Sequence, residues 1–352
     1  MNAWLSTSWV GLLSLLTCLF SGLTSAQSLK PSNPLSTVAE STQTRSTQRN
    51  ASQWLMRMHE ASRRRAYVGT FVVMAGGSMA SSRIWHACDG DQQIEKIESL
   101  NGSPRTIYRR NDQVVTFAPQ SKVAVSERRQ SMGLFPGLLK SKDSSISTFY
   151  AAQHSHVERV AGFDADVVNL LPKDPLRFGY RIWSEKITGL AIKLQTLDND
   201  GRVLEQVAFS DLRIDVPLNI NKLHQMMIQT EGYRVEKQEF IKTDAWSEGW
   251  IFKADVPGFN AMNCYRRPAL IKPSVIDETL QCVFSDGLAS VSLFIEPFDR
   301  KHHSQEALLA MGATHTLTRR IPEKSGDWWL TAVGEVPSRT LIVFAQGLER
   351  RK

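Results

Sequence analysis

The chain has 352 residues, of which 42% are hydrophobic and 22% charged, and its formal net charge is +7. This apolar content excludes an intrinsically disordered protein, and the length predicts about two domains. A basic surface attracts nucleic acid, anionic lipid or an acidic protein segment, and the export signal described next argues against nucleic acid.

The first residues have the pattern of an export signal. Residues 1–26 contain no Lys, Arg, Asp or Glu, and residues 9–16 form an apolar run of signal-peptide length. Small residues precede Ala26, so we expect a signal peptide over 1–26 that is cleaved near Ala26. Residues 27–48 are rich in Ser, Thr, Pro and Gln. We expect them to form a flexible lead-in without fixed structure.

Residues 49–218 are predicted to form one helix and a large antiparallel sheet. Asn50 and Gln53 have the spacing of a capping box, and Trp54, Met58 and Ala61 recur on one helical face. Apolar and polar residues then alternate in short runs between turn signals. These runs are 67–74, 82–88, 94–100, 106–110, 113–117, 157–163, 165–171, 177–183, 190–197 and 203–209. Such a sheet has one apolar face, which a second sheet, a helix or a lipid-like ligand must cover.

The alternation stops between residues 127 and 147. Leu134, Phe135 and Leu138 lie there in a segment that Gly and Pro interrupt. Exposed apolar residues in a long loop are typical of a mobile binding element, but the same residues could simply pack into the core. Both interpretations stay open.

The second half is predicted to hold a linker and a smaller domain. Residues 219–247 lose strand periodicity and become polar, which is typical of an inter-domain linker. Residues 248–352 are predicted to form an α+β domain with a final apolar helix over 337–348. Its predicted strands are 250–252, 262–266, 280–284, 289–295, 312–318 and 328–333.

Three cysteines remain after removal of the signal peptide. Cys264 and Cys282 have a separation typical of neighbouring strands, and export places them in an oxidising compartment. They could form a disulfide, or they could be free core residues. Cys88 would be the odd thiol.

The usual enzyme signatures are absent from the sequence. It contains no G-x-S-x-G elbow, no phosphate-binding glycine loop, no dinucleotide fingerprint and no H-E-x-x-H motif. We therefore expect no catalytic residue, no metal and no cofactor. An exported hydrolase with unrecognised residues is kept as a competing hypothesis.

Several stretches resemble the MucB/RseB family of periplasmic sigma-factor regulatory proteins. They are Trp54 to Met58, Tyr67 to Val72, Arg159 to Gly162, Gly179 to Trp183, Thr188 to Leu190, Val203 to Gln206, and Ser285 to Ser292. These short stretches are spread over nearly the whole mature chain, across both predicted domains, and follow the family order. The resemblance implies an α+β fold that is mainly antiparallel β. Its large N-terminal domain would be a half-open β-barrel with a covering helix, like the LolA/LolB lipoprotein carriers, followed by the smaller C-terminal α+β domain.

The resemblance also implies a function that is not enzymatic. Such a protein is a periplasmic negative regulator of a sigma factor of the envelope stress response. It would bind the periplasmic part of an RseA/MucA-like anti-sigma factor, protect it from regulated proteolysis, and be released by lipopolysaccharide or another acyl-chain ligand. The alternative function is a periplasmic lipid or lipoprotein carrier, and a homo-oligomer stays open.

The lipid would occupy a cavity on the apolar face of the first domain. For every cavity candidate, ordinary core packing is the alternative. The candidates are Phe71, Val73, Trp85, Phe178, Tyr180, Ile182 and Phe209.

Overall fold

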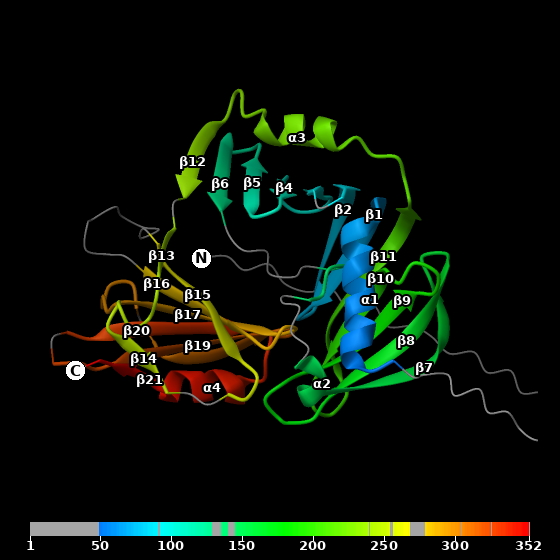
Figure 1. The fold of residues 1–352 in the computed structure, drawn as a ribbon. Coiled ribbons are helices and arrows are strands. Elements are labelled where there is room, and N and C mark those ends of the chain that lie inside the picture. Colours follow the sequence, from blue (N-terminus) through cyan, green and yellow to red (C-terminus); the bar gives the residue numbers. More distant parts are fainter. Residues whose placement is uncertain are drawn as a thin grey trace, which may run out of the picture. The chain divides into compact units, whose positions relative to one another are not determined.

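The computed structural model describes residues 49–351 except 91, 129–134, 140–144, 239, 254–255, 268–278, 304 and 325. The predicted signal peptide and lead-in therefore lie outside the described residues. The described chain is mainly antiparallel strand with few helices, which confirms the expected fold class (Figure 1). None of the described helices is long and apolar enough to cross a membrane.

Twelve of the described strands form one large sheet. They are β1 (Tyr67–Ala75), β2 (Ser78–Asp89), β3 (Gln92–Ser99), β4 (Thr106–Arg110), β5 (Gln113–Ala118), β6 (Val123–Arg128), β7 (Tyr150–Val160), β8 (Phe163–Pro172), β9 (Gly179–Glu185), β10 (Ala191–Leu197), β11 (Val203–Ile214) and β12 (Arg234–Gln238). Their spatial order is β12-β6-β5-β4-β3-β2-β1-β11-β10-β9-β8-β7. All neighbours are antiparallel except β12 and β6. No pairing among the described strands joins β12 to β7, so the sheet is open, as expected for a half-open barrel.

Two local features of this sheet differ from the prediction. The turn between β7 and β8 lies at Ala161 and Gly162, both with positive φ, rather than after Phe163. The structure also adds β6 and the short helix α2 (Ile146–Phe149). α2 has only four residues, too few for a helical periodicity to be recognised.

Helix α1 (Ala51–Arg64) covers part of the large sheet. Its capping box forms as predicted, because the Asn50 side chain accepts from the Gln53 backbone at 2.9 Å and the Gln53 side chain accepts from the Asn50 backbone at 2.8 Å. Trp54, Met58 and Ala61 are buried, as predicted. Burial stabilises each large apolar side chain by roughly 1.5–3 kcal/mol.

Arg57 fixes α1 to the turn between β9 and β10. Its guanidinium donates to the Ser184 hydroxyl at 2.9 Å and to the Lys186 carbonyl at 2.7 Å. Gly189 in this turn has a φ of +88°, and a Cβ there would lie 2.8 Å from the Arg57 side chain. Glycine is therefore required both by the backbone conformation and by the close approach of Arg57.

The predicted linker, residues 219–247, contains regular structure. Helix α3 (Ile220–Ile228) begins after Asn219, whose side chain accepts from the Lys222 backbone at 2.9 Å. α3 packs on the large sheet through Leu223 and Met227. β12 then extends the large sheet and β13 (Ile241–Thr243) extends the smaller one. The connection between the two sheets is therefore confined to the residues between Gln238 and Ile241.

The second domain contains a smaller sheet. Its other described strands are β15 (Asn260–Arg267), β16 (Thr279–Ser285), β17 (Ser290–Pro297), β18 (Ala307–Met311), β19 (Thr314–Ile321) and β20 (Trp328–Gly334), in the order β13-β15-β16-β17-β20-β19-β18. β14 (Trp250–Phe252) pairs with β21 (Leu348–Arg350), and α4 (Ser338–Gln346) packs its apolar face into the core of the smaller sheet. The strand predicted over 312–318 corresponds to β19, and the structure adds β18, which pairs with β19 around a turn at Gly312 with a φ of +60°.

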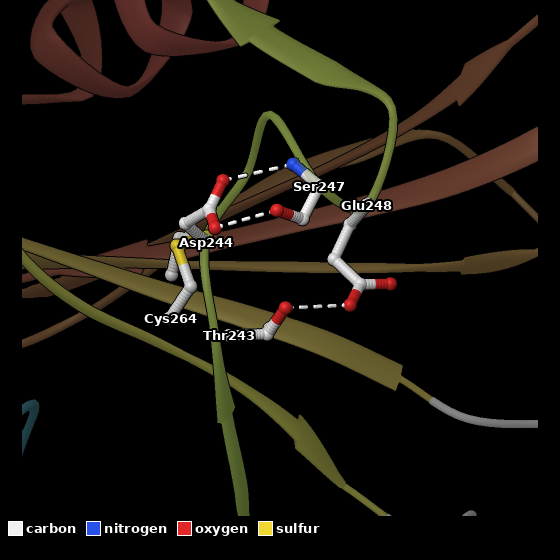
Figure 2. The surroundings of a disulfide bond; sticks show 6 residues. Thr243, Asp244, Ser247, Glu248 and Cys264 are labelled. Carbon is white, nitrogen blue, oxygen red and sulfur yellow. Dashed lines mark hydrogen bonds between the residues drawn. A yellow bond between two sulfur atoms is a disulfide. The ribbon is translucent and has the colours of Figure 1, made fainter.

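Cys264 and Cys282 form a disulfide between directly paired residues of β15 and β16, with a Cα–Cα distance of 4.1 Å. Both cysteines are buried. Figure 2 shows that the bond lies beside the turn that follows β13, where Thr243 donates to Glu248 at 2.6 Å and Asp244 accepts from the backbone and hydroxyl of Ser247. The disulfide therefore cross-links β15 and β16 of the smaller sheet close to the inter-domain connection.

Candidate binding site

Strand register places five of the seven predicted cavity residues on one face of the large sheet. Directly paired residues point to the same face of a sheet. Phe71 pairs with Phe209, and Ile182 pairs with Leu194, which pairs with Val207. We call this face the inner face, and α1 packs against it. It carries Phe71, Val73, Tyr180, Ile182 and Phe209.

The other two candidates lie elsewhere. Trp85 neighbours Ile84 on β2 and points to the opposite face, where the Arg83 guanidinium lies 5.2 Å and the Lys96 ammonium 4.6 Å from its ring centroid. Phe178 precedes β9 and contacts the ring of His315 in the second domain, with centroids 5.5 Å apart. The structure therefore does not bring Trp85 or Phe178 together with the other five.

Three phenylalanines form an aromatic cluster on the inner face. The ring centroids of Phe71, Phe135 and Phe209 are 5.2–6.2 Å apart. Gly69 makes room for it, since a Cβ at this position would lie 2.7 Å from the Phe209 ring and from the Asp211 carbonyl. This close approach gives a physical reason for glycine within the stretch from Tyr67 to Phe71.

The segment 135–139 supplies one member of the aromatic cluster and covers part of the inner face. Leu138 and Leu139 are each 7% exposed and pack in the core that contains α1. Phe135 is half-buried between this core and the neighbouring one. Leu134 lies outside the described residues. The structure thus puts Phe135 and Leu138 in contact with the core.

A row of polar side chains lies beside the aromatic cluster. Tyr67, His86, Glu95 and Arg109 are paired in succession across β1 to β4. Arg109 donates to Glu95 at 2.5 Å, and the ring of Tyr67 stacks on that of His86 at 4.7 Å. His86 Nδ1 lies 2.8 Å from the Arg65 carbonyl, so Nδ1 is the donor and Nε2 is left as an acceptor.

Two polar atoms of this row are unpartnered. The Tyr67 hydroxyl and His86 Nε2 are buried without a hydrogen-bond partner among the described residues. Burial raises the pKa of Tyr67, so its hydroxyl stays protonated. The inner face therefore combines apolar rings with one free donor and one free acceptor, the groups that an amphipathic ligand would use.

The second part of the site is the junction between the two domains, which is built around Arg177. This side chain is 0% exposed. Its guanidinium donates to Asp174 at 2.5 Å within its own domain, and to Asp286 at 2.8 Å and the Pro257 carbonyl in the second domain. The guanidinium also lies over the rings of Phe149, at 4.3 Å, and Phe259, at 5.0 Å.

Asp286 completes this ion pair, which we call the junction pair. It lies in the turn between β16 and β17, where one carboxylate oxygen accepts from the backbones of Leu288 and Ala289 at 3.0 and 2.7 Å. The other oxygen accepts from Arg177 and, at 3.3 Å, from the Tyr150 hydroxyl. Because the pair is buried and each partner has further hydrogen bonds, loss of one partner costs about 3–5 kcal/mol.

Further contacts surround the junction pair. The Thr340 hydroxyl of α4 donates to the Leu176 carbonyl at 2.7 Å, and Leu288 packs in the same core as α1. Gly258 has a φ of +83°, and a Cβ there would lie 2.3 Å from the Phe149 ring. The segment before β9 is therefore held by several elements of the second domain.

Sequence reasoning missed the roles of Arg177 and Asp286. Both lie in stretches that the sequence analysis singled out, at the start of a predicted strand and in an Asp-Gly turn. Neither stretch shows a partner for its charge, because the two residues are 109 positions apart. The signal that the sequence offered for both residues was a charged side chain next to an apolar run.

Two family models match this chain. The model of the MucB/RseB N-terminal domain matches residues 50–227, and the model of the MucB/RseB C-terminal domain matches residues 244–349. The sigma factor AlgU regulatory protein MucB of Pseudomonas aeruginosa is 28% identical over 294 residues, covering 83% of this chain and 88% of that protein. The sigma-E factor regulatory protein RseB of Haemophilus influenzae is 26% identical over 307 residues, covering 86% and 92%.

Solved structures of similar proteins include complexes. MucB in complex with MucA(peri) is 25% identical and has a TM-score of 0.67, over 86% of this chain and 99% of that one. The Pseudomonas aeruginosa MucA/MucB complex is 26% identical with the same TM-score and coverage. The similarity therefore extends over both domains in one alignment.

Proposed function

Because the chain belongs to the MucB/RseB family, we propose that it is a periplasmic negative regulator in the envelope stress response, and that it binds the periplasmic part of a membrane anti-sigma factor. The observation that carries this proposal is the similarity, over both domains, to proteins whose structures were solved together with MucA. The curated relatives are named as regulatory proteins, so the proposal is a binding function and not an enzymatic one.

We propose further that the protein protects the anti-sigma factor from proteolysis and that a lipid releases the protein from it. The inner face supports a lipid ligand, because aromatic rings suit acyl chains while Tyr67 and His86 offer hydrogen-bonding groups to a polar head. The net charge of +7 suits an anionic lipid such as lipopolysaccharide. If the lipid binds the partner-free form more tightly, linkage requires that it weakens partner binding by the same factor.

A binding titration tests both parts. The mature chain, starting at residue 27, is titrated with the periplasmic part of the anti-sigma factor from the same organism, with and without lipopolysaccharide. We expect binding that lipopolysaccharide weakens, and protection of the bound segment from a site-specific protease. Binding that is insensitive to lipid would reject the release mechanism. Lipid binding without any partner binding would instead favour a lipid or lipoprotein carrier.

A matched pair of variants locates the lipid site. Phe71 and Trp85 are both half-buried aromatic residues on neighbouring strands, but they point to opposite faces of the sheet. We expect Phe71→Ala to reduce the effect of lipopolysaccharide on partner binding, and Trp85→Ala to leave it unchanged. Equal effects of the two variants would mean that the inner face is not the lipid site.

A further inference from the structure

The junction between the domains differs from an ordinary contact surface because it contains a buried ion pair. Arg177 and Asp286 come from different domains, and their exposed fractions are 0% and 1%. Their ion pair is formed out of contact with water, so it is maintained only while the two domains stay together. An isolated buried charge is strongly unfavourable, and separation of the domains would therefore have to admit water to both groups.

Tyr150 connects this pair to the inner face. Its hydroxyl donates to Asp286, and its ring contacts the ring of Tyr180 with centroids 6.1 Å apart. Tyr150, Tyr180 and Leu138 share one core with Leu288, which lies two residues after Asp286. A guest that displaces side chains of this core would therefore also disturb the hydrogen bonds of the junction pair.

We propose that Arg177 is a positioning residue: the junction pair holds the two domains in the arrangement that binds the protein partner, and a guest on the inner face weakens partner binding by opening this junction. The effect of a guest on partner binding rests on the proposed function. The role of the junction pair in holding the two domains together concerns the chain alone, because the arrangement of the domains can be measured without any partner.

The test compares Arg177→Met with Arg202→Met in the full mature chain. Arg202 is a matched control, since it is an exposed arginine of the same domain that pairs with Asp198 and Asp200. Distances between spin labels on exposed Gln120 and Lys324 report the arrangement of the domains, in a background that carries Cys88→Ser. We expect a broader distance distribution for Arg177→Met only. An unchanged distribution would overturn the proposal. If Arg177→Met does not fold, Arg177→Lys, which keeps the charge, serves the same comparison.

A cross-link separates positioning from general destabilisation. A Cβ at Gly312 would lie 2.9 Å from the Cβ of Ala75, so the pair A75C/G312C can join the domains after a small shift. We expect Arg177→Met to weaken partner binding by about tenfold or more, and the cross-link to restore it. Failure of the formed cross-link to restore binding would overturn the positioning role.

The same cross-link tests the coupling to the lipid. In the cross-linked chain with Arg177 intact, we expect partner binding to persist and lipopolysaccharide to have lost its effect on it. Equal weakening by lipopolysaccharide with and without the cross-link would overturn the coupling. If the wild-type chain does not bind the partner at all, the proposed function fails, whereas the spin-label distances still decide whether Arg177 holds the domains together.

Discussion

The disulfide should stabilise the second domain alone. The bond between Cys264 and Cys282 closes a chain segment with a sequence separation of 18. In the chain-entropy model, closing a loop of this length in the unfolded state stabilises the fold by about 3 kcal/mol at 25 °C. Both cysteines are buried, so removing the sulfur atoms leaves small cavities that cost about 1 kcal/mol more. We expect Cys264→Ala/Cys282→Ala to lose about 3–4 kcal/mol.

Amide hydrogen exchange can assign this loss to one sheet, because exchange reports local opening free energies. A loss of about 3 kcal/mol lowers protection roughly 150-fold. We expect this reduction in β16 and β17, and little change in β9 and β10 of the large sheet. Cys88→Ala is the control, since Cys88 is a free thiol in the first domain. A reduction below about tenfold, or equal reductions in both sheets, would refute the reasoning.

Two further predictions concern single residues. Gly189→Ala should lower the free energy of unfolding by about 2–4 kcal/mol, because its Cβ would collide with Arg57 in addition to the strained φ. Gly201→Ala, which has a φ of +81° and no atom within 4 Å of a Cβ, should lose only about 1 kcal/mol, and similar losses in urea denaturation would contradict this account. Burial lowers the pKa of His315, whose ring contacts Phe178 at the junction. The unfolded state therefore takes up this proton first, and the free energy of unfolding should fall as the pH decreases below about 6.5. His315→Gln should flatten this dependence in urea titrations between pH 7 and 5; an unchanged slope would exclude His315 as its source.

Local patterns predicted the strands of the large sheet well. The alternation in β9, β10 and β11 is long enough to distinguish a strand from a helix, and the capping box of α1 requires only neighbours three residues apart. The face of Trp85 was wrongly grouped with that of Phe71, although the parity of the β1–β2 register separates them. The sequence predicts the turn at Gly76 and Gly77, and counting the register outward from this turn already pairs Trp85 with Val68 rather than with a residue on the face of Phe71.

Contacts between distant segments could not be predicted in the same way. α3 and β13 lie in a polar stretch whose structure depends on the sheets that they contact, as the burial of the α3 residues Leu223 and Met227 against the large sheet shows. The junction pair depends on how the two domains pack, and no local pattern encodes that packing. The apolar positions can therefore be read from the sequence, whereas only the folded structure determines which charged side chains become buried.

The short connection after β12 limits what the two domains can do when they part. Gln238 still pairs with β6, and Ile241 already pairs with β15. Three Cα–Cα steps of about 3.8 Å separate these residues, so their Cα atoms can never be more than about 11 Å apart. If both pairings persist, the two domains can rotate about this short connection, but they cannot separate from each other at this point. Any large opening must therefore occur at the side remote from this connection.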